Sequence, residues 1–301
     1  MVCHRQGSIL GPLLFLIYVN DLHRCSEILS FIVFSDDTNT FYSHKNINTL
    51  KDIVNRELVK VSSWLRANKL SLNIKKTQVI IFKAKNKKLQ ESIDIKLNNE
   101  KIKQVKSIKF LGINIDSNLT WKQHINYITK KVSKTTGILY KARHYVSPNI
   151  LRTLYHALVY PYLHYGNIIW ANTYPTRLDK IKKLQKKIIR IITFSNYTAE
   201  TAPLFKKLSI LSIDNINNEA VAIFMFRYFN NGLPISFQNF FKLNKELHNY
   251  NTRSSTQIHK NYIRTNYKKY STVNKGREIW NCLPNAIKDS KSLNIFKSKI
   301  R

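Results

Sequence analysis

Hydrophobic residues recur at helical spacing along the first part of the chain. Residues 6–21 predict a Gly-Ser turn that leads into a helix, and because this helix is apolar nearly all round we expect it to be buried. A second pattern, from Asn48 to Arg66, predicts an amphipathic helix with its apolar residues three and four positions apart. The polar face of this second helix is expected to carry Glu57, Lys60 and Arg66.

Short apolar segments on either side of the second helix have strand character. FIVF at 31–34 and TNTFY at 38–42 predict two strands with Asp36 and Asp37 between them, which is a hairpin with two carboxylates at its tip. LSLNI, QVIIF, IDIKL and FLGINI follow at 70–74, 78–82, 93–97 and 110–115, and Asn98-Asn99 supplies a turn. We expect these strands to form one sheet with the hairpin.

The pattern becomes helical from residue 120 onward. Thr120-x-x-Gln123 predicts a capping box that opens a long helix, whose apolar residues step by four and three as far as Val146. Ser147-Pro148 predicts the start of a second helix, which Pro161 ends or kinks. A third helix is predicted from about Thr176 to Phe194, with Ile181, Leu184, Ile188 and Ile191 on one stripe.

The charge of the chain is large and unevenly placed. The 301 residues carry a net charge of +33, yet residues 1–44 contain only Arg5 and Arg24 against four carboxylates. A polyanionic partner explains this excess of cations. For the basic helices, a solvated polar face is the common alternative to phosphate contact, and a membrane-surface helix is a third possibility.

Three cysteines, at positions 3, 25 and 282, are too far apart for a zinc site, so we expect no zinc and no structural disulfide. The apolar run from Ile9 to Val19 imitates a secretory signal, but Gly11-Pro12 interrupts it and no small-residue cleavage site follows. No apolar run reaches the roughly 18 to 20 residues of a membrane span. We therefore expect an intracellular protein, nuclear and cytoplasmic, without a membrane partner.

Four blocks in order then carry a family resemblance: RQGSILGPLLFLIYVNDL, the FSDD hairpin, WLRANKLSLNIKKTQVIIF and KFLGINIDSNLTWKQHI. Together they resemble the reverse transcriptase of non-LTR retrotransposons, particularly the jockey-like group of mobile elements. ALVYPYLHYGNIIW, HNYNTR and KGREIWNCLPNAI resemble downstream parts of the same reading frames, so the resemblance covers essentially the whole chain. The implied activity is that of an RNA-directed DNA polymerase, a nucleotidyltransferase used in transposition.

The resemblance implies roles for individual residues. Gln6 and Gly7 match motif B, where nucleotide and template approach the backbone closely, although an ordinary turn fits them equally well. Asp36 and Asp37 match the motif C carboxylates that hold two Mg²⁺ ions, with Asp36 the principal ligand. Lys76 matches the motif D general acid, although neighbouring lysines also occur as solvated loop residues. Phe110, Leu111 and Gly112 resemble the primer grip, for which a core strand ending in a glycine bulge is the alternative.

The implied fold is α+β. Residues 1–116 correspond to a partial polymerase palm, an antiparallel sheet with helices; residues 117–175 to thumb helices; and residues 176–301 to a basic, mainly helical C-terminal region. The thumb tracks the hybrid of RNA template and DNA primer, and dNTPs are the substrates of the intact family. The expected backbone contacts are Lys130, Lys131, Lys134, Lys141, Arg143, Lys183, Lys187 and Arg190.

Two family features have no counterpart in the sequence. The family places a further metal-binding Asp and the fingers before motif B, whereas Met1 lies five residues before Gln6, and Arg5 stands where the family has Pro. We therefore expect a fragment that is inactive by itself. The alternatives are a remnant that binds RNA or a hybrid without catalysis, and a basic scaffold that binds protein or membrane. Trp280, Tyr250 and Arg253 could stack on bases or pack, and packing is favoured for Trp280.

Overall fold

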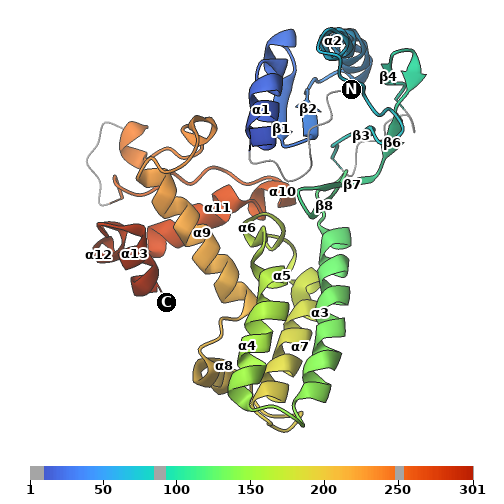
Figure 1. The fold of residues 1–301 in the computed structure, drawn as a ribbon. Coiled ribbons are helices and arrows are strands. Elements are labelled where there is room, and N and C mark those ends of the chain that lie inside the picture. The colour runs from blue at the N-terminus through green and yellow to red at the C-terminus, as the bar shows by residue number, and fades with distance from the viewer. Residues whose placement is uncertain (1–9, 85–92, 248–253, 301) are drawn as a thin grey trace. The chain divides into compact units, whose positions relative to one another are not determined.

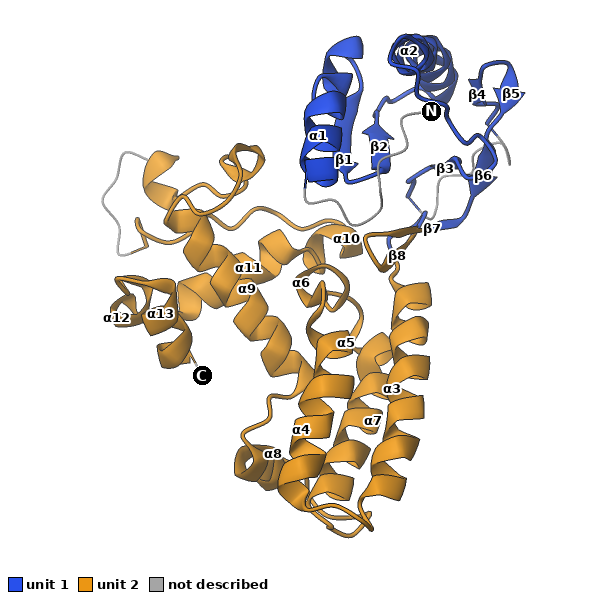
Figure 2. Cartoon of the chain, in the orientation of Figure 1, with its two compact units in different colours: residues 1–108, 116–119 blue, residues 109–115, 120–301 orange. Residues whose placement is uncertain are grey.

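The computed structural model describes residues 10–84, 93–247 and 254–300. Within it the chain forms two compact units, residues 1–108 with 116–119 (unit 1) and residues 109–115 with 120–301 (unit 2), which Figure 2 colours separately. The element order along the chain can be followed in Figure 1. The expectations for Cys3, Gln6, Gly7, Tyr250 and Arg253 lie outside the described residues.

Unit 1 contains two long helices and one short one. The first, α1, spans Leu10–Val19; η1 follows at Leu22–Cys25; and α2 spans Ile47–Ala67. The side chain of Asn46 caps α2, because its Oδ1 accepts from the backbone N of Asn48 at 2.9 Å. Both helices were predicted from their hydrophobic patterns, and α2 begins one residue before the expected start.

The expectation that α1 is buried is wrong. Only Val19 is buried, while Leu10, Leu13, Leu14, Leu16 and Ile17 are all at least half exposed. The physical reason lies in the neighbourhood: the core next to η1 and α2 is built from Leu22, Leu29 and Val61, and the α1 leucines take no part in it. An all-round apolar pattern predicted the helix but not its burial.

The described strands of unit 1 are short, and each pairs with one other strand. The hairpin consists of β1, Ser30–Phe34, and β2, Asp37–Phe41. A second antiparallel pair is β4, Lys96–Leu97, with β5, Glu100–Lys101, and the pair β3, Gln78–Ile80, with β6, Lys103–Val105, is parallel.

The expected single sheet is therefore wrong, because the described strands form separate two-stranded sheets. Positive φ at Asn98 (50°) and Asn99 (65°) closes β4 and β5 into a two-residue hairpin, which confirms the turn expected there. LSLNI contains no strand, because Asn73 instead organises a turn: its carbonyl oxygen accepts from the backbone N of Lys76 and of Thr77.

A further hairpin, β7 (Ser107–Phe110) with β8 (Ile113–Asp116), carries the chain from unit 1 into unit 2. Leu111 and Gly112 form its turn with φ of 43° and 82°. The segment predicted as the single strand FLGINI is thus divided by a tight turn, since two consecutive residues with positive φ reverse the chain.

Unit 2 begins with a helical bundle. Its elements are α3 (Lys122–Ala142), α4 (Pro148–Leu158), α5 (Tyr160–His164), α6 (Asn167–Trp170) and α7 (Pro175–Ile192). Helix α4 ends before Pro161, as expected from that proline. The apolar stripes of α3 and α7 pack into one core with α4 and α5, and the expected boundary at residue 176 falls in the first turn of α7.

The helix expected at Thr120 is confirmed, but its predicted capping box is wrong. The cap residue is Trp121, in the left-handed conformation with φ of 61°, and it makes no side-chain capping bond. Thr120 Oγ1 accepts from the backbone N of Lys122 at 3.4 Å, one residue earlier than a capping box requires. A left-handed residue at the cap turns the preceding chain away from the helix axis, so the expected reciprocal bonds are not aligned.

The remaining helices of unit 2 follow the bundle, and the later ones form a second core. They are α8 (Ala202–Leu208), α9 (Ile213–Phe229), η2 (Ile235–Phe237), η3 (Asn244–Glu246), α10 (Asn266–Lys269), α11 (Thr272–Cys282), α12 (Asn285–Lys288) and α13 (Leu293–Ile300). Trp280 is 6% exposed and stacks on Phe229 at 4.9 Å between ring centres, which confirms that it packs. Phe296 and Met225 complete this core.

Candidate metal-binding hairpin and nucleic-acid interface

The hairpin of β1 and β2 presents two adjacent carboxylates to solvent. Phe34 pairs with Asp37, so Ser35 and Asp36 form the two-residue turn and Asp37 is the first residue of β2. Ser35 takes the left-handed conformation with φ of 53°. Asp36 and Asp37 are both exposed, at the tip that the sequence predicted.

One face of the hairpin packs and the other does not. Phe31 and Val33 pack against the core that contains Val61 of α2, whereas Ile32 and Phe34 are 48% and 59% exposed. The alternation of inward and outward residues follows from the two-residue period of a strand. The carboxylate tip is thus held by one packed face only.

A buried ionic group anchors the chain before β1 to α2. Glu57 Oε2 accepts from Ser26 Oγ at 2.8 Å and from Lys60 Nζ at 2.9 Å, and its Oε1 lies 3.3 Å from Arg56 Nε. Hydrogen bonding to Lys60, and then to Ser26, holds the pKa of Glu57 below its usual value. Ser26 Oγ also accepts from the backbone N of Leu29, so the carboxylate fixes the entry to the hairpin.

The expectation that Glu57 lies on a solvated polar face is therefore wrong, because its side chain is fully buried. The helical spacing of apolar residues gave no sign of it. A signal would have been available only from Ser26, which lies far away in the sequence.

The donor chemistry of the hairpin tip fits a magnesium ion. Carboxylate oxygens are its preferred protein ligands, and Mg²⁺ commonly uses one or two of them while water and phosphate oxygens complete its shell. Among the described residues, no group of three or more His, Cys, Asp or Glu side chains is placed to hold a metal. Asp36 and Asp37 thus offer two carboxylates as candidate ligands.

Lys76 lies in an exposed turn of unit 1. Its backbone N donates to Asn73 Oδ1 at 3.2 Å, and Thr77 Oγ1 donates to the Asn73 carbonyl oxygen at 3.0 Å. Asn73, Lys76 and Thr77, which the resemblance groups into one motif, are therefore joined by hydrogen bonds within one turn. The Lys76 side chain is exposed.

The Leu111-Gly112 turn of unit 2 is held by a residue that the sequence analysis did not single out. Tyr165 Oη donates to the Leu111 carbonyl oxygen at 2.6 Å. Gly166 follows with φ of 59°, and a Cβ there would lie 2.4 Å from Ile113 Cδ1 of β8. In the YPYLHYG segment, Tyr165 and Gly166 therefore both serve the close contact with the FLG turn.

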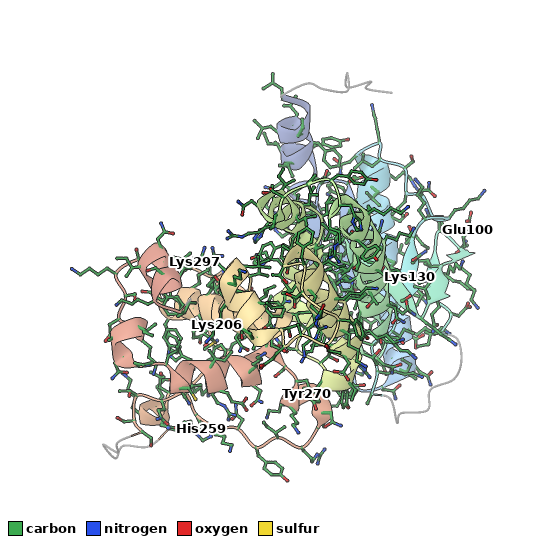
Figure 3. The ribbon with its side chains drawn as sticks, turned by 90° about the horizontal axis from the view of Figure 1, so that it is seen from below. Glu100, Lys130, Lys206, His259, Tyr270 and Lys297 are labelled. Atoms are coloured by element: carbon green, nitrogen blue, oxygen red, sulfur yellow. The ribbon has the colours of Figure 1, made fainter. Side chains whose placement is uncertain are left out.

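The eight expected backbone-contact residues of α3 and α7 fall into two groups. The six lysines are exposed, and within the described ranges none of them forms a salt bridge; Lys130 is labelled in Figure 3. Arg143 and Arg190 are half-buried beside aromatic rings, with Arg143 4.9 Å from the Phe194 ring centre and Arg190 5.9 Å from that of Tyr197. The lysines thus keep their charges free for an anionic partner.

Parts of the chain are similar to one protein family and to several known proteins. Residues 2–115 match the family model described as reverse transcriptase (RNA-dependent DNA polymerase). Over 224 residues the chain is 25% identical to the probable RNA-directed DNA polymerase from transposon X-element of Drosophila melanogaster, a match that covers 71% of this chain and 24% of that relative. Residues 2–115 thus resemble a reverse transcriptase segment, and most of the chain is similar to polymerases of mobile elements.

Two further relatives of this chain come from the same fly. The RNA-directed DNA polymerase from mobile element jockey is 23% identical over 227 residues, and the probable RNA-directed DNA polymerase from transposon BS is 25% identical over 219 residues. The two matches cover 71% and 69% of this chain, and each covers 24% of the relative. The chain thus spans about a quarter of the length of these relatives. No solved structure matches the chain.

Among the described residues, no helix is long and apolar enough to cross a bilayer. Cys25 is half-buried and Cys282 is exposed, and both are free thiols. Burial raises the pKa of the Cys25 thiol.

Proposed function

We propose that this reverse transcriptase chain supplies the metal-binding hairpin and part of the template-primer interface of an RNA-directed DNA polymerase. Residues 1–116 would act as a partial palm, residues 117–175 as the thumb and residues 176–301 as a basic helical extension. The observation that carries the proposal is the exposed Asp36-Asp37 pair at the tip of a hairpin that lies within the matched segment 2–115.

Asp36 and Asp37 would hold Mg²⁺, with Asp36 as the principal ligand. When bound there, the ion supplies Lewis-acid stabilisation of phosphoryl oxygens. The chain's own contribution is to place two carboxylates at a turn whose conformation is fixed by the β1–β2 register. Gln6 and Gly7 would approach the nucleotide and template, Lys76 would act as general acid, and Phe110, Leu111 and Gly112 would support the primer terminus.

The exposed lysines of α3 and α7 would bind the phosphate backbone of an RNA/DNA hybrid. Such contacts give affinity without base information, and each one releases condensed counterions. The affinity of the chain for a hybrid should therefore fall steeply as salt rises.

The first test measures hybrid binding against salt concentration for Lys130→Ala/Lys134→Ala. Each lost phosphate contact reduces the slope of log K against log salt by about 0.9, so this double variant should lose roughly 2 from the slope. Lys206→Ala/Lys207→Ala removes two exposed lysines of α8 and is the matched control. An unchanged slope in the α3 variant would remove that helix from the interface.

The second test counts Mn²⁺ bound to the hybrid complex by electron paramagnetic resonance, with Mn²⁺ replacing Mg²⁺. We expect Asp36→Asn/Asp37→Asn to lose the hairpin-bound ion, whereas Asp179→Asn/Asp289→Asn, at two exposed sites in unit 2, keeps it. Unchanged Mn²⁺ binding together with a steep salt dependence would favour the alternative of a nucleic-acid-binding protein without catalysis. Primer extension on an RNA template by the 301-residue chain would contradict our expectation that the chain does not act alone.

A further inference from the structure

A cavity of about 320 Å³ lies in the C-terminal part of unit 2, away from the residues discussed above. Its walls come from the loop before η3, the segment 258–271 and the first turns of α11. His259 and Tyr270, which are labelled in Figure 3, lie near the two ends of that segment. The volume lies at the lower end of the range for small-ligand sites.

The charge of the cavity wall is of one sign. Lys242, Lys268 and Arg277 line it together with His259, and none of the described lining residues is an Asp or Glu. Lys268 Nζ donates to the Tyr262 carbonyl oxygen at 3.0 Å, which holds its ammonium group in place while leaving two further N–H donors. Such a wall favours an anionic ligand.

Arg277 is the buried member of this set, with only 7% of its surface exposed. Its hydrogen bonds to described residues both use Nη2, to Asn274 Oδ1 at 2.8 Å and to Glu278 Oε1 at 3.4 Å. Nε and Nη1 therefore keep donors for a ligand, since a guanidinium has five N–H groups. Glu278 is 60% exposed, so solvent weakens its neutralisation of the guanidinium.

Two features of the KGREIWNCLP segment build this wall. A Cβ on Gly276 would lie 2.6 Å from Met225 Sδ, so the glycine lets α11 approach α9 and carries Arg277 to the cavity. Asn281 holds the opposite segment: its Oδ1 accepts from Ile258 N at 3.0 Å, and its Nδ2 donates to Ile258 O at 3.1 Å. The side-chain amide thereby pairs with the backbone as a neighbouring strand would.

An aromatic ring completes the cavity. Phe240 lines it and is 45% exposed, and its ring is supported edge-on by Phe237 at 5.0 Å between ring centres. Asn239 and Asn261 add amide groups that can donate and accept. Cations beside an exposed ring and hydrogen-bonding amides match the three parts of a nucleotide, namely its phosphate, its flat base and the polar base edge.

We propose that this cavity binds one unpaired nucleotide of a single-stranded nucleic acid, with the phosphate at Arg277 and Lys268 and the base on Phe240. The proposal rests on the proposed function only in taking nucleic acid as the partner. An acidic peptide would satisfy the cations but would leave the exposed ring without a flat group to stack on. A free nucleotide has the same chemistry, and the test separates the two sources.

The test uses the full 301-residue chain and measures binding of a fluorescent single-stranded oligonucleotide by anisotropy. Phe240→Ala should weaken binding at least about fivefold, the lower bound for loss of one base-stacking contact. Lys268→Ala, which removes an exposed lysine at the cavity, should weaken it severalfold, whereas Lys206→Ala in α8 should change it less than twofold. Arg277→Lys should also weaken it, with circular dichroism confirming that this buried position still permits folding.

A 5-iodouridine oligonucleotide gives a readout of position, because it should crosslink to the peptide that contains Phe240. Competition then identifies the ligand: unlabelled oligonucleotide should displace the probe at far lower concentration than a mononucleotide, inorganic phosphate or polyglutamate. Equal displacement by polyglutamate, or equal strength of the free nucleotide, would overturn the proposal. Unchanged oligonucleotide binding in both Phe240→Ala and Lys268→Ala would also overturn the proposal. The proposed function would still stand if hybrid binding kept its salt dependence.

Discussion

Unit 1 and unit 2 bury their apolar residues to very different extents. The bundle core of unit 2 joins α3, α4, α5 and α7 through fully buried side chains such as Val132, Leu163 and Ile188. Unit 1 has two smaller cores, around Leu22 and around Ile95, and it leaves most of α1 and one face of the β1–β2 hairpin exposed. The comparison teaches that the hairpin with Asp36 and Asp37 is carried by the less densely packed unit, whereas the basic helices lie on a scaffold with a large core.

The largest expected effect on the free energy of unfolding comes from truncating one core leucine in each unit. Leu163→Ala in the bundle should cost about 4 kcal/mol, whereas Leu22→Ala in unit 1 should cost about 2 kcal/mol, because a smaller core relaxes more readily around the cavity. Urea unfolding followed by hydrogen exchange resolves the two units. Equal costs would show that the smaller core of unit 1 is packed as rigidly as the bundle.

The second effect concerns a buried polar group of the bundle. Gln185 is 1% exposed, and its Nε2 donates to Tyr155 Oη and to Leu211 O while its Oε1 accepts from Ile213 N, each at 2.9 Å. Gln185→Leu should cost about 3 kcal/mol, because backbone groups lose their partners in a dry core. Gln123→Leu, at an exposed site on α3, is the control and should change the unfolding free energy by less than about 0.5 kcal/mol.

The third effect is the pH dependence of unit 2. His124 is 3% exposed, its Nδ1 accepts from Asn114 N at 3.3 Å, and burial lowers its pKa to about 4. The unfolded chain takes up a proton near pH 6.5 that the folded chain refuses, so stability is full above that pH and falls as the pH drops towards 4. The loss should reach at most about 3 kcal/mol.

His124→Asn, which keeps an acceptor near Nδ1 but does not titrate, should remove this slope between pH 6.5 and 4. Glu57 provides the contrast in unit 1, because its lowered pKa makes unit 1 lose stability only as the pH falls below the ordinary carboxyl value of 4.5. Acidification should therefore weaken unit 2 before the Glu57 anchor of unit 1. A slope that survives in His124→Asn would assign the effect to another group.

The smallest expected effect is at the FLG turn. Tyr165→Phe removes the hydrogen bond to Leu111 O and should cost about 1 kcal/mol or less, since Tyr165 is 57% exposed. Tyr145→Phe, at a residue 87% exposed, is the control. If the turn supports the primer terminus, Tyr165→Phe should weaken hybrid binding more than it weakens folding.

Local sequence patterns predicted the helices and strands of this chain better than they predicted what surrounds each element. Helical spacing identified α2, α3 and α7, and the DD turn between apolar segments identified the hairpin. The burial of α1, the single sheet and the capping box were predicted wrongly, because each depends on what lies beside the segment rather than on the segment itself.

The remaining features could not be predicted for a related reason. Glu57 is buried because Ser26 approaches it from a distant part of the sequence, and the nucleotide-sized cavity needs residues 239–277 brought together. Gly276, Arg277 and Asn281 all lie in the KGREIWNCLPNAI segment, which the sequence analysis singled out. Their contacts with Met225 and Ile258, which are distant in the sequence, could not be predicted from that segment.

The two hydrogen bonds of Asn281 make the cavity wall sensitive to chemical ageing. Spontaneous deamidation turns the amide into a carboxylate, which only accepts and would face the Ile258 carbonyl oxygen with no proton between them. Deamidation would thus replace the hydrogen bond between Asn281 and the Ile258 carbonyl oxygen by a repulsion between two oxygens. The segment at Ile258, which lines the cavity, would be held less firmly. Deamidation of Asn281 would therefore alter the C-terminal cavity while leaving the bundle core unchanged.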